Sequence, residues 1–110
     1  MIRKAFVMKL TPGMEEEYWR RHNPIWKELE EVLRLHGVQS YSIFLHPESY
    51  QLFAYAEIEN EDRWQSIAST PECRRWWDFL AELMEINEDH SPKTTELREV
   101  FHLGNTTSKG

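Results

Sequence analysis

The order in which two kinds of hydrophobic pattern follow one another is the strongest constraint on how this chain folds. Four segments alternate apolar and polar side chains with the period of a β-strand: 2–10, 38–46, 51–58 and 96–103. Pro47-Glu48-Ser49 lies between the second and third of these segments, and such residues favour a tight turn. We therefore expect the second and third strands to form a hairpin.

Helical periodicity fills the intervals between these strands. Three segments show it: 14–36, 60–69 and 71–84. Asn60 opens the second segment, and Thr70, followed by Pro71, opens the third; both are typical helix start signals. Pro24 divides the first of them into 14–22 and 24–36, because proline cannot donate the backbone hydrogen bond of a helix interior. The pattern allows either one kinked helix or two helices, the second capped by Asn23, and the sequence leaves both open.

The resulting order, β-α-β-β-α-β, predicts an α+β ferredoxin-like fold of the dimeric α+β barrel type. In that fold a four-stranded antiparallel sheet carries its helices on one face. Segment 51–58 has apolar residues on both of its faces, so the face without helices also needs cover. We expect a second copy of the chain to supply it, in a homodimer packed sheet to sheet.

The length of 110 residues, with 40% hydrophobic residues, is that of one folded domain. We expect residues 1–103 to form it and residues 104–110, GNTTSKG, to be a flexible C-terminal tail.

Charge and composition exclude several classes of protein. A net charge of −6 opposes non-specific binding of nucleic acid. No apolar run approaches the ~18 residues of a membrane span, and the N-terminus lacks the apolar core of a signal peptide. The single cysteine, Cys73, rules out an internal disulfide framework. We expect a cytoplasmic protein without nucleic-acid or membrane partners.

His22 is the first candidate for chemistry. Tyr18 lies one helical turn before it, and Ile25 continues the same apolar stripe, so His22 points into the protein. A hydrogen-bonded core histidine is the commonest explanation of such a position. However, Pro24 interrupts the helix beside His22 and can open a cleft there. With an ordinary pKa of about 6.5, histidine can pass protons in both directions, so we interpret His22 as a catalytic acid/base group.

Aromatic residues supply candidate walls for that cleft. Trp76 and Trp77 project about 100° apart on a helix and cannot stack on each other. Either they fill the core and its edge, or they form two walls of a pocket. Tyr41 is either a core tyrosine with its hydroxyl at a rim or, if its strand face meets the helix of His22, a pocket hydrogen-bonding group. We assign three other tryptophans to packing or to an interface: Trp19, Trp26 and Trp64.

Patterns for other chemistry are missing from the sequence. The remaining histidines show no metal-ligand spacing, and no glycine-rich phosphate loop is present. Cys73 lies near a predicted helix N-terminus but in no nucleophile motif. We therefore expect neither a metal nor a cofactor.

Several short segments together resemble the L-rhamnose mutarotase family. They are RRHNPIW (20–26), AST (68–70), CRRWW (73–77), SP (91–92) and ELREVF (96–101). The resemblance extends from Ile2 to about Leu103 without an evident insertion, so it covers nearly the whole chain.

This resemblance implies a small dimeric α+β enzyme that interconverts the α and β anomers of L-rhamnose without a cofactor. It also implies residue roles. His22 corresponds to the catalytic proton donor of the family, and four residues match sugar-contacting positions: Tyr18, Tyr41, Trp76 and Trp77. Two alternatives remain from the fold class: a small monooxygenase or haem-degrading enzyme, and a non-enzymatic sugar-binding dimer.

Overall fold

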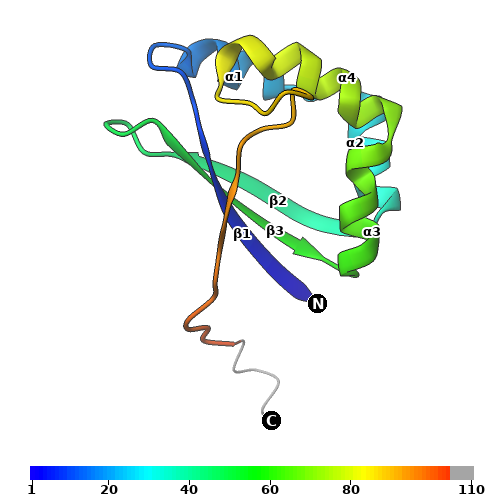
Figure 1. Cartoon of the computed structure of the whole chain (residues 1–110). Coiled ribbons are helices and arrows are strands. Elements are labelled where there is room, and N and C mark those ends of the chain that lie inside the picture. Colours follow the sequence, from blue (N-terminus) through cyan, green and yellow to red (C-terminus); the bar gives the residue numbers. More distant parts are fainter. Residues whose placement is uncertain (105–110) are drawn as a thin grey trace.

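A four-stranded antiparallel sheet forms one layer of the protein, and the helices cover one face of it (Figure 1). The structure is a computed structural model and describes residues 1–104. The strands are β1 (Ile2–Lys9), β2 (Val38–Leu45), β3 (Gln51–Ile58) and β4 (Thr95–Leu97), in the order β2-β3-β1-β4. This architecture confirms the predicted ferredoxin-like class.

Within residues 1–104 the helical layer consists of four α-helices and two short 3₁₀ turns. They are α1 (Glu15–His22), α2 (Lys27–Leu35), α3 (Glu61–Ser66), η1 (Ile67–Ser69), α4 (Pro71–Leu80) and η2 (Ala81–Leu83). The predicted start signals are confirmed: the side chains of Asn60 and Thr70 accept hydrogen bonds from the backbone N–H groups of Arg63 and Cys73. Each bond satisfies a donor that a helix start would otherwise leave unpaired.

Alternation along the central strands separates a core face from an open face. The buried residues of β1 and β3 all lie beneath the helices: Phe6, Met8, Leu52, Ala54, Ala56 and Ile58. In the register of the hairpin Tyr41 lies opposite Ala56. Because directly opposed residues share one face of a sheet, Tyr41 belongs to the helix-covered face.

The chain around Pro24 forms two helices rather than one kinked helix. Helix α1 ends at His22, and Asn23 adopts φ −133° and ψ 88°, outside the helical region. A residue before proline is pushed in this direction by the proline ring. The expectation that Asn23 caps the second helix is wrong: its Nδ2 donates to the carbonyl of Trp19 at 2.7 Å and so closes α1.

The last strand is much shorter than the predicted segment 96–103. In the described part of the chain, strand β4 pairs only with residues Ala5–Val7 of β1. Residues 98–104 leave the sheet, as Figure 1 shows, and an extended segment without a ladder partner is no longer a strand. The predicted tail falls outside the described residues from 105 onward. Within residues 1–104 no helix has the length and apolar character needed to cross a membrane.

Candidate active site

A cavity of about 1050 Å³ lies between the helices and the covered face of the sheet. Its size lies just above the ~300–1000 Å³ typical of small-molecule sites. All five residues proposed from the sequence contribute to its lining: Tyr18, His22, Tyr41, Trp76 and Trp77. They come from α1, β2 and α4, which are far apart in the sequence, and the fold brings them to one hollow.

His22 occupies the last position of α1 and is half-buried between two aromatic rings. Its ring centroid lies 4.2 Å from that of Tyr18 and 5.1 Å from that of Trp76, which meets it edge to face. The two contacts restrict the imidazole from opposite helices, α1 and α4. The ring is therefore held in place while part of it remains at the cavity.

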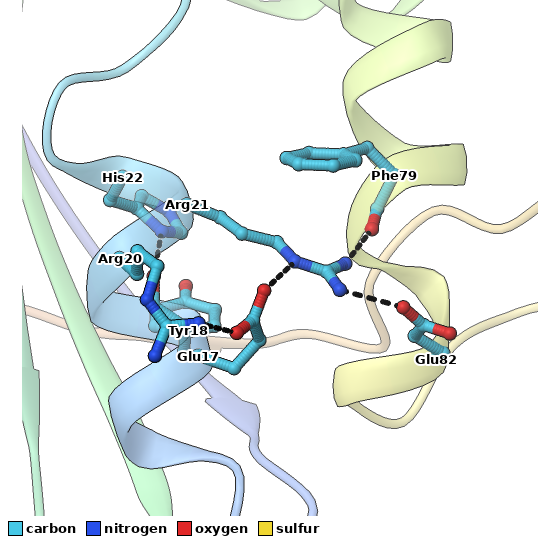
Figure 2. A network of polar contacts seen from close by, with 7 residues as sticks. All are labelled: Glu17, Tyr18, Arg20, Arg21, His22, Phe79 and Glu82. Atoms are coloured by element: carbon cyan, nitrogen blue, oxygen red, sulfur yellow. Dashed lines mark hydrogen bonds and ion pairs between the residues drawn. The ribbon is translucent and has the colours of Figure 1, made fainter.

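One hydrogen bond determines which ring nitrogen of His22 carries a proton. Nδ1 lies 2.8 Å from the carbonyl oxygen of Tyr18, a contact drawn as a dashed line in Figure 2. A carbonyl can only accept, so Nδ1 must be the protonated nitrogen. Nε2 is then the nitrogen that can accept a proton or, once protonated, donate one.

The surroundings of His22 favour its neutral form. Burial among apolar rings lowers the pKa of His22, because the charged form loses hydration there, and the Tyr18 carbonyl only partly opposes this effect. The imidazole is thus a neutral base with a free Nε2 near pH 7.

Two tyrosine hydroxyls face the same hollow. In residues 1–104 neither the Tyr18 nor the Tyr41 hydroxyl has a hydrogen-bond partner, and both residues line the cavity. Burial raises the pKa of both tyrosines, so both remain protonated. Tyr41 as a residue is 37% exposed, but that exposure does not relieve the desolvation of its hydroxyl. Each hydroxyl can donate to or accept from a ligand oxygen.

The two adjacent tryptophans point to different neighbours, as their helical spacing predicts. Trp76 is buried against His22 and, on its other side, against Trp26 at a centroid distance of 5.1 Å. Trp77 is half-buried, and the Arg74 guanidinium lies 5.1 Å from its ring centroid. Both rings line the cavity, so the pair forms two of its walls.

The structure also adds residues to this lining that the sequence pattern did not assign to it. Trp64, assigned to packing or an interface, lies 5.8 Å from the ring of Tyr41 and lines the cavity. Cys73 lines it as well, and burial raises the pKa of its thiol to about 11. No spacing signal connects either residue to His22, because both are brought there by the packing of helices on the sheet.

No group of three or more His, Cys, Asp or Glu side chains within residues 1–104 is placed to hold a metal ion. The groups that line the cavity include the neutral imidazole of His22, the hydroxyls of Tyr18 and Tyr41, and broad aromatic surfaces. Such a set can hydrogen-bond a small polyhydroxylated ring, cover its C–H faces and move a proton at one of its oxygens.

Comparison with known proteins points to one family. The L-rhamnose mutarotase family matches residues 3–103. An L-rhamnose mutarotase of Opitutus terrae is 61% identical over 94% of this chain and 99% of its own length. The crystal structure of an L-rhamnose mutarotase from Formosa agariphila has a TM-score of 0.88 at 38% identity, covering 94% of this chain and all of that one.

A more distant structure shares the fold alone. A Bacteroides fragilis protein, described as dimeric, of unknown function and with a ferredoxin-like fold, has a TM-score of 0.54 at 21% identity and covers 88% of this chain and 94% of its own. The matches to the mutarotases, by contrast, span almost every residue that builds the sheet, the helices and the cavity. The chain belongs to the L-rhamnose mutarotase family.

Proposed function

We propose that this protein interconverts the α and β anomers of L-rhamnose, with His22 moving the proton. Membership of the family makes it an isomerase that acts on the anomeric carbon. The observation that carries the role of His22 is its place in the lining of the cavity, and the bond from Nδ1 to the Tyr18 carbonyl leaves Nε2 as its basic nitrogen. Among residues 1–104, this is the histidine that lines the cavity.

Anomer exchange requires one proton to leave the C1 hydroxyl and one to reach the ring oxygen. In our scheme neutral Nε2 accepts the hydroxyl proton while the C1–O5 bond breaks and C1=O forms. The same nitrogen then donates that proton to O5, which gives the open-chain aldehyde and restores neutral His22. Rotation about C1–C2 and reversal of both transfers close the other anomer. A positioned acid/base group of this kind contributes about 10²–10⁴-fold.

The hydroxyls and tryptophans have a binding role in this scheme. The Tyr18 and Tyr41 hydroxyls hydrogen-bond sugar oxygens, for which the cavity offers them room. Trp76 and Trp77 cover the apolar faces of the ring and the C6 methyl group. Since an apolar pocket rejects an added hydroxyl only about 10²-fold, L-mannose, which differs from L-rhamnose by a C6 hydroxyl, should be a poor substrate rather than an inert one.

Proton NMR with saturation transfer between the anomeric signals of L-rhamnose tests this function. Acceleration of exchange over the buffer rate at micromolar protein is the expected result, with a smaller acceleration for L-mannose. An exchange rate equal to that of buffer for both sugars would leave a sugar-binding protein without this activity.

We further propose that two copies pack sheet to sheet. The open face carries apolar side chains in register with one another: Ala5, Val7, Phe44, Phe53, Tyr55 and Leu97. Phe44 is 65% exposed there, and beyond β4 the extended segment exposes three more apolar side chains: Val100, Phe101 and Leu103. Contiguous apolar surface of this kind marks an interface. The related Bacteroides fragilis fold is described as dimeric.

Light scattering coupled to size exclusion would give twice the chain mass for the wild type. Phe44→Ser should shift the protein toward the mass of one chain. Leu35→Ser is the matched control, because Leu35 is similarly exposed but belongs to α2 on the helical side. Equal masses for the Phe44 and Leu35 variants would contradict this interface. The cytoplasm remains our proposed location, since a chain with a single, buried cysteine does not rely on internal disulfides.

A further inference from the structure

The helix that carries His22 needs support from outside itself. α1 has eight residues, and isolated helices shorter than about 12 residues are marginal in water. His22 is its last residue, in the turn where helices fray most readily. The position of the imidazole therefore depends on contacts that tie the end of α1 to the rest of the fold.

Arg21, the residue before His22, makes such contacts. Figure 2 shows its guanidinium reaching from α1 to the end of α4 and to η2. Nη2 donates to Oε2 of Glu82 at 2.7 Å, Nη1 donates to the carbonyl oxygen of Phe79, and Nε donates to Oε2 of Glu17 at 2.7 Å. The guanidinium carbon also lies 4.6 Å from the centroid of the Phe79 ring.

These partners suit arginine and no other side chain. A planar fork with five donors can serve three acceptors in one plane and still stack on an aromatic ring, which an ammonium group cannot do. The Phe79 carbonyl belongs to the last turn of α4, where carbonyls lack helical partners and the helix dipole favours a cation. Arg21 thus satisfies an unpaired group of α4 while holding α1.

The contacts form a closed chain around the imidazole. Phe79 packs on Trp76 with ring centroids 5.7 Å apart, and Trp76 packs edge to face on His22 at 5.1 Å. His22 follows Arg21 directly in α1. We propose that Arg21 is a positioning residue that holds His22 against the Trp76 wall of the cavity. This inference rests on the proposed function for its kinetic consequences but not for its structural ones.

Arg20 provides a matched control. It precedes Arg21 in the same motif and pairs with the same Glu17, but its side chain is 66% exposed against 15% for Arg21. In the described residues its one ion pair stays within α1. Arg20→Gln removes the same charge as Arg21→Gln without touching α4.

The experiment measures kcat and KM for L-rhamnose, together with nuclear Overhauser effects between the His22 and Trp76 ring protons. In Arg21→Gln we expect kcat to fall about tenfold with KM nearly unchanged, because a misplaced acid/base group impairs proton transfer more than binding. The ring-to-ring effects should weaken. Arg21→Lys should recover kcat only in part, and Arg20→Gln should match the wild type in both readouts.

A folded Arg21→Gln protein with wild-type kcat and intact ring-to-ring effects would overturn the proposal, as would an equal loss in Arg20→Gln. If Arg21→Gln does not fold, Glu82→Gln is the second variant, because it removes one partner of Arg21 at an exposed position. Its kcat should fall a few-fold, and an unchanged kcat would overturn the proposal. A wild type that does not accelerate anomer exchange would refute the proposed function, and the Overhauser effects would still decide whether Arg21 positions His22.

Discussion

His22 and His36 make the same local contact, yet only one of them belongs to a site. Each lies at the C-terminal end of a short helix, is half-buried, and has Nδ1 2.8 Å from the carbonyl oxygen four residues earlier. His22 is enclosed by Tyr18 and Trp76 and lines the cavity. In the part of the chain that the structure describes, His36 neither lines the cavity nor pairs with an aromatic ring. The bond to the backbone is therefore a property of helix ends. The cavity and the neighbouring aromatic rings are what distinguish His22 from His36.

The residues that come after the two histidines differ as well. After His36, Gly37 adopts φ +88° and turns the chain directly into β2. After His22, Asn23 and Pro24 lead through a short loop before α2 begins at Lys27. A glycine ending brings the next strand close to the helix. The Asn-Pro ending instead leaves α1 and α2 as separate helices, and both contribute residues to the cavity lining.

The strongest test of the difference between His22 and His36 replaces each imidazole with an amide. His22→Gln keeps a donor near the Tyr18 carbonyl but removes the titrating nitrogen, so we expect kcat to fall about 10²–10⁴-fold. His36→Gln is the matched variant and should keep the wild-type kcat. Anomer exchange by saturation-transfer NMR measures both, with circular dichroism to verify folding. Comparable losses in the two variants would mean that His22 holds no special role.

The pH dependence sharpens the assignment of His22 as a base. Because burial lowers its pKa below the ordinary value of about 6.5, kcat/KM should be level near pH 7 and fall as pH drops through the lowered pKa, by about tenfold per unit beyond it. A rate that rises on acidification would contradict a neutral acceptor.

The lowered pKa of His22 also makes the stability of the folded protein depend on pH. The unfolded chain binds the His22 proton more readily than the folded one, so stability should decrease as pH falls from about 6.5 through the lowered pKa. His22→Gln should lack this part of the decrease. Urea unfolding at several pH values measures it.

Removing one tyrosine hydroxyl should have a smaller effect. Tyr18→Phe keeps the ring that packs on His22 and deletes one hydrogen bond to the sugar, typically worth about 0.5–1.5 kcal/mol. We expect a two- to tenfold loss in kcat/KM. Tyr55→Phe on the open face of the sheet should leave kcat/KM unchanged. Identical kinetics for Tyr18→Phe and the wild type would remove this hydroxyl from the site.

The smallest effect on activity is expected at the glycine that ends the helix of His36. A left-handed backbone costs a non-glycine residue about 1–2 kcal/mol, and an added Cβ at Gly37 would lie 3.1 Å from Cβ of Glu59. Gly37→Ala should therefore lower the free energy of unfolding, measured in urea, while kcat stays at the wild-type level. A fall in kcat of the folded variant would show that this helix end also influences the cavity.

The sequence predicted the parts of the molecule that depend on local pattern. Alternation located β1 to β3, and the signals at Asn60 and Thr70 located the helix starts. The spacing of Tyr18 and His22 also placed them on one face of one helix, because three or four residues make one turn. These features are properties of neighbouring residues.

The features that the sequence did not predict depend on packing between distant segments. Whether 96–103 forms a strand depends on how far β1 can pair with it, and pairing stops at Leu97. Trp64 enters the cavity because α3 packs near Tyr41, and Arg21 acquires its role from acceptors about sixty residues later, at Phe79 and Glu82. No periodicity within one segment reports on such contacts.

The raised pKa of Cys73 has a practical consequence for labelling. Only the thiolate reacts with maleimide or iodoacetamide reagents, and at pH 8 a thiol with a pKa of about 11 is ionised in about one molecule per thousand. Its burial slows reagents further. A second cysteine engineered at an exposed position could therefore carry a fluorophore or spin label selectively, with the native residue left in place.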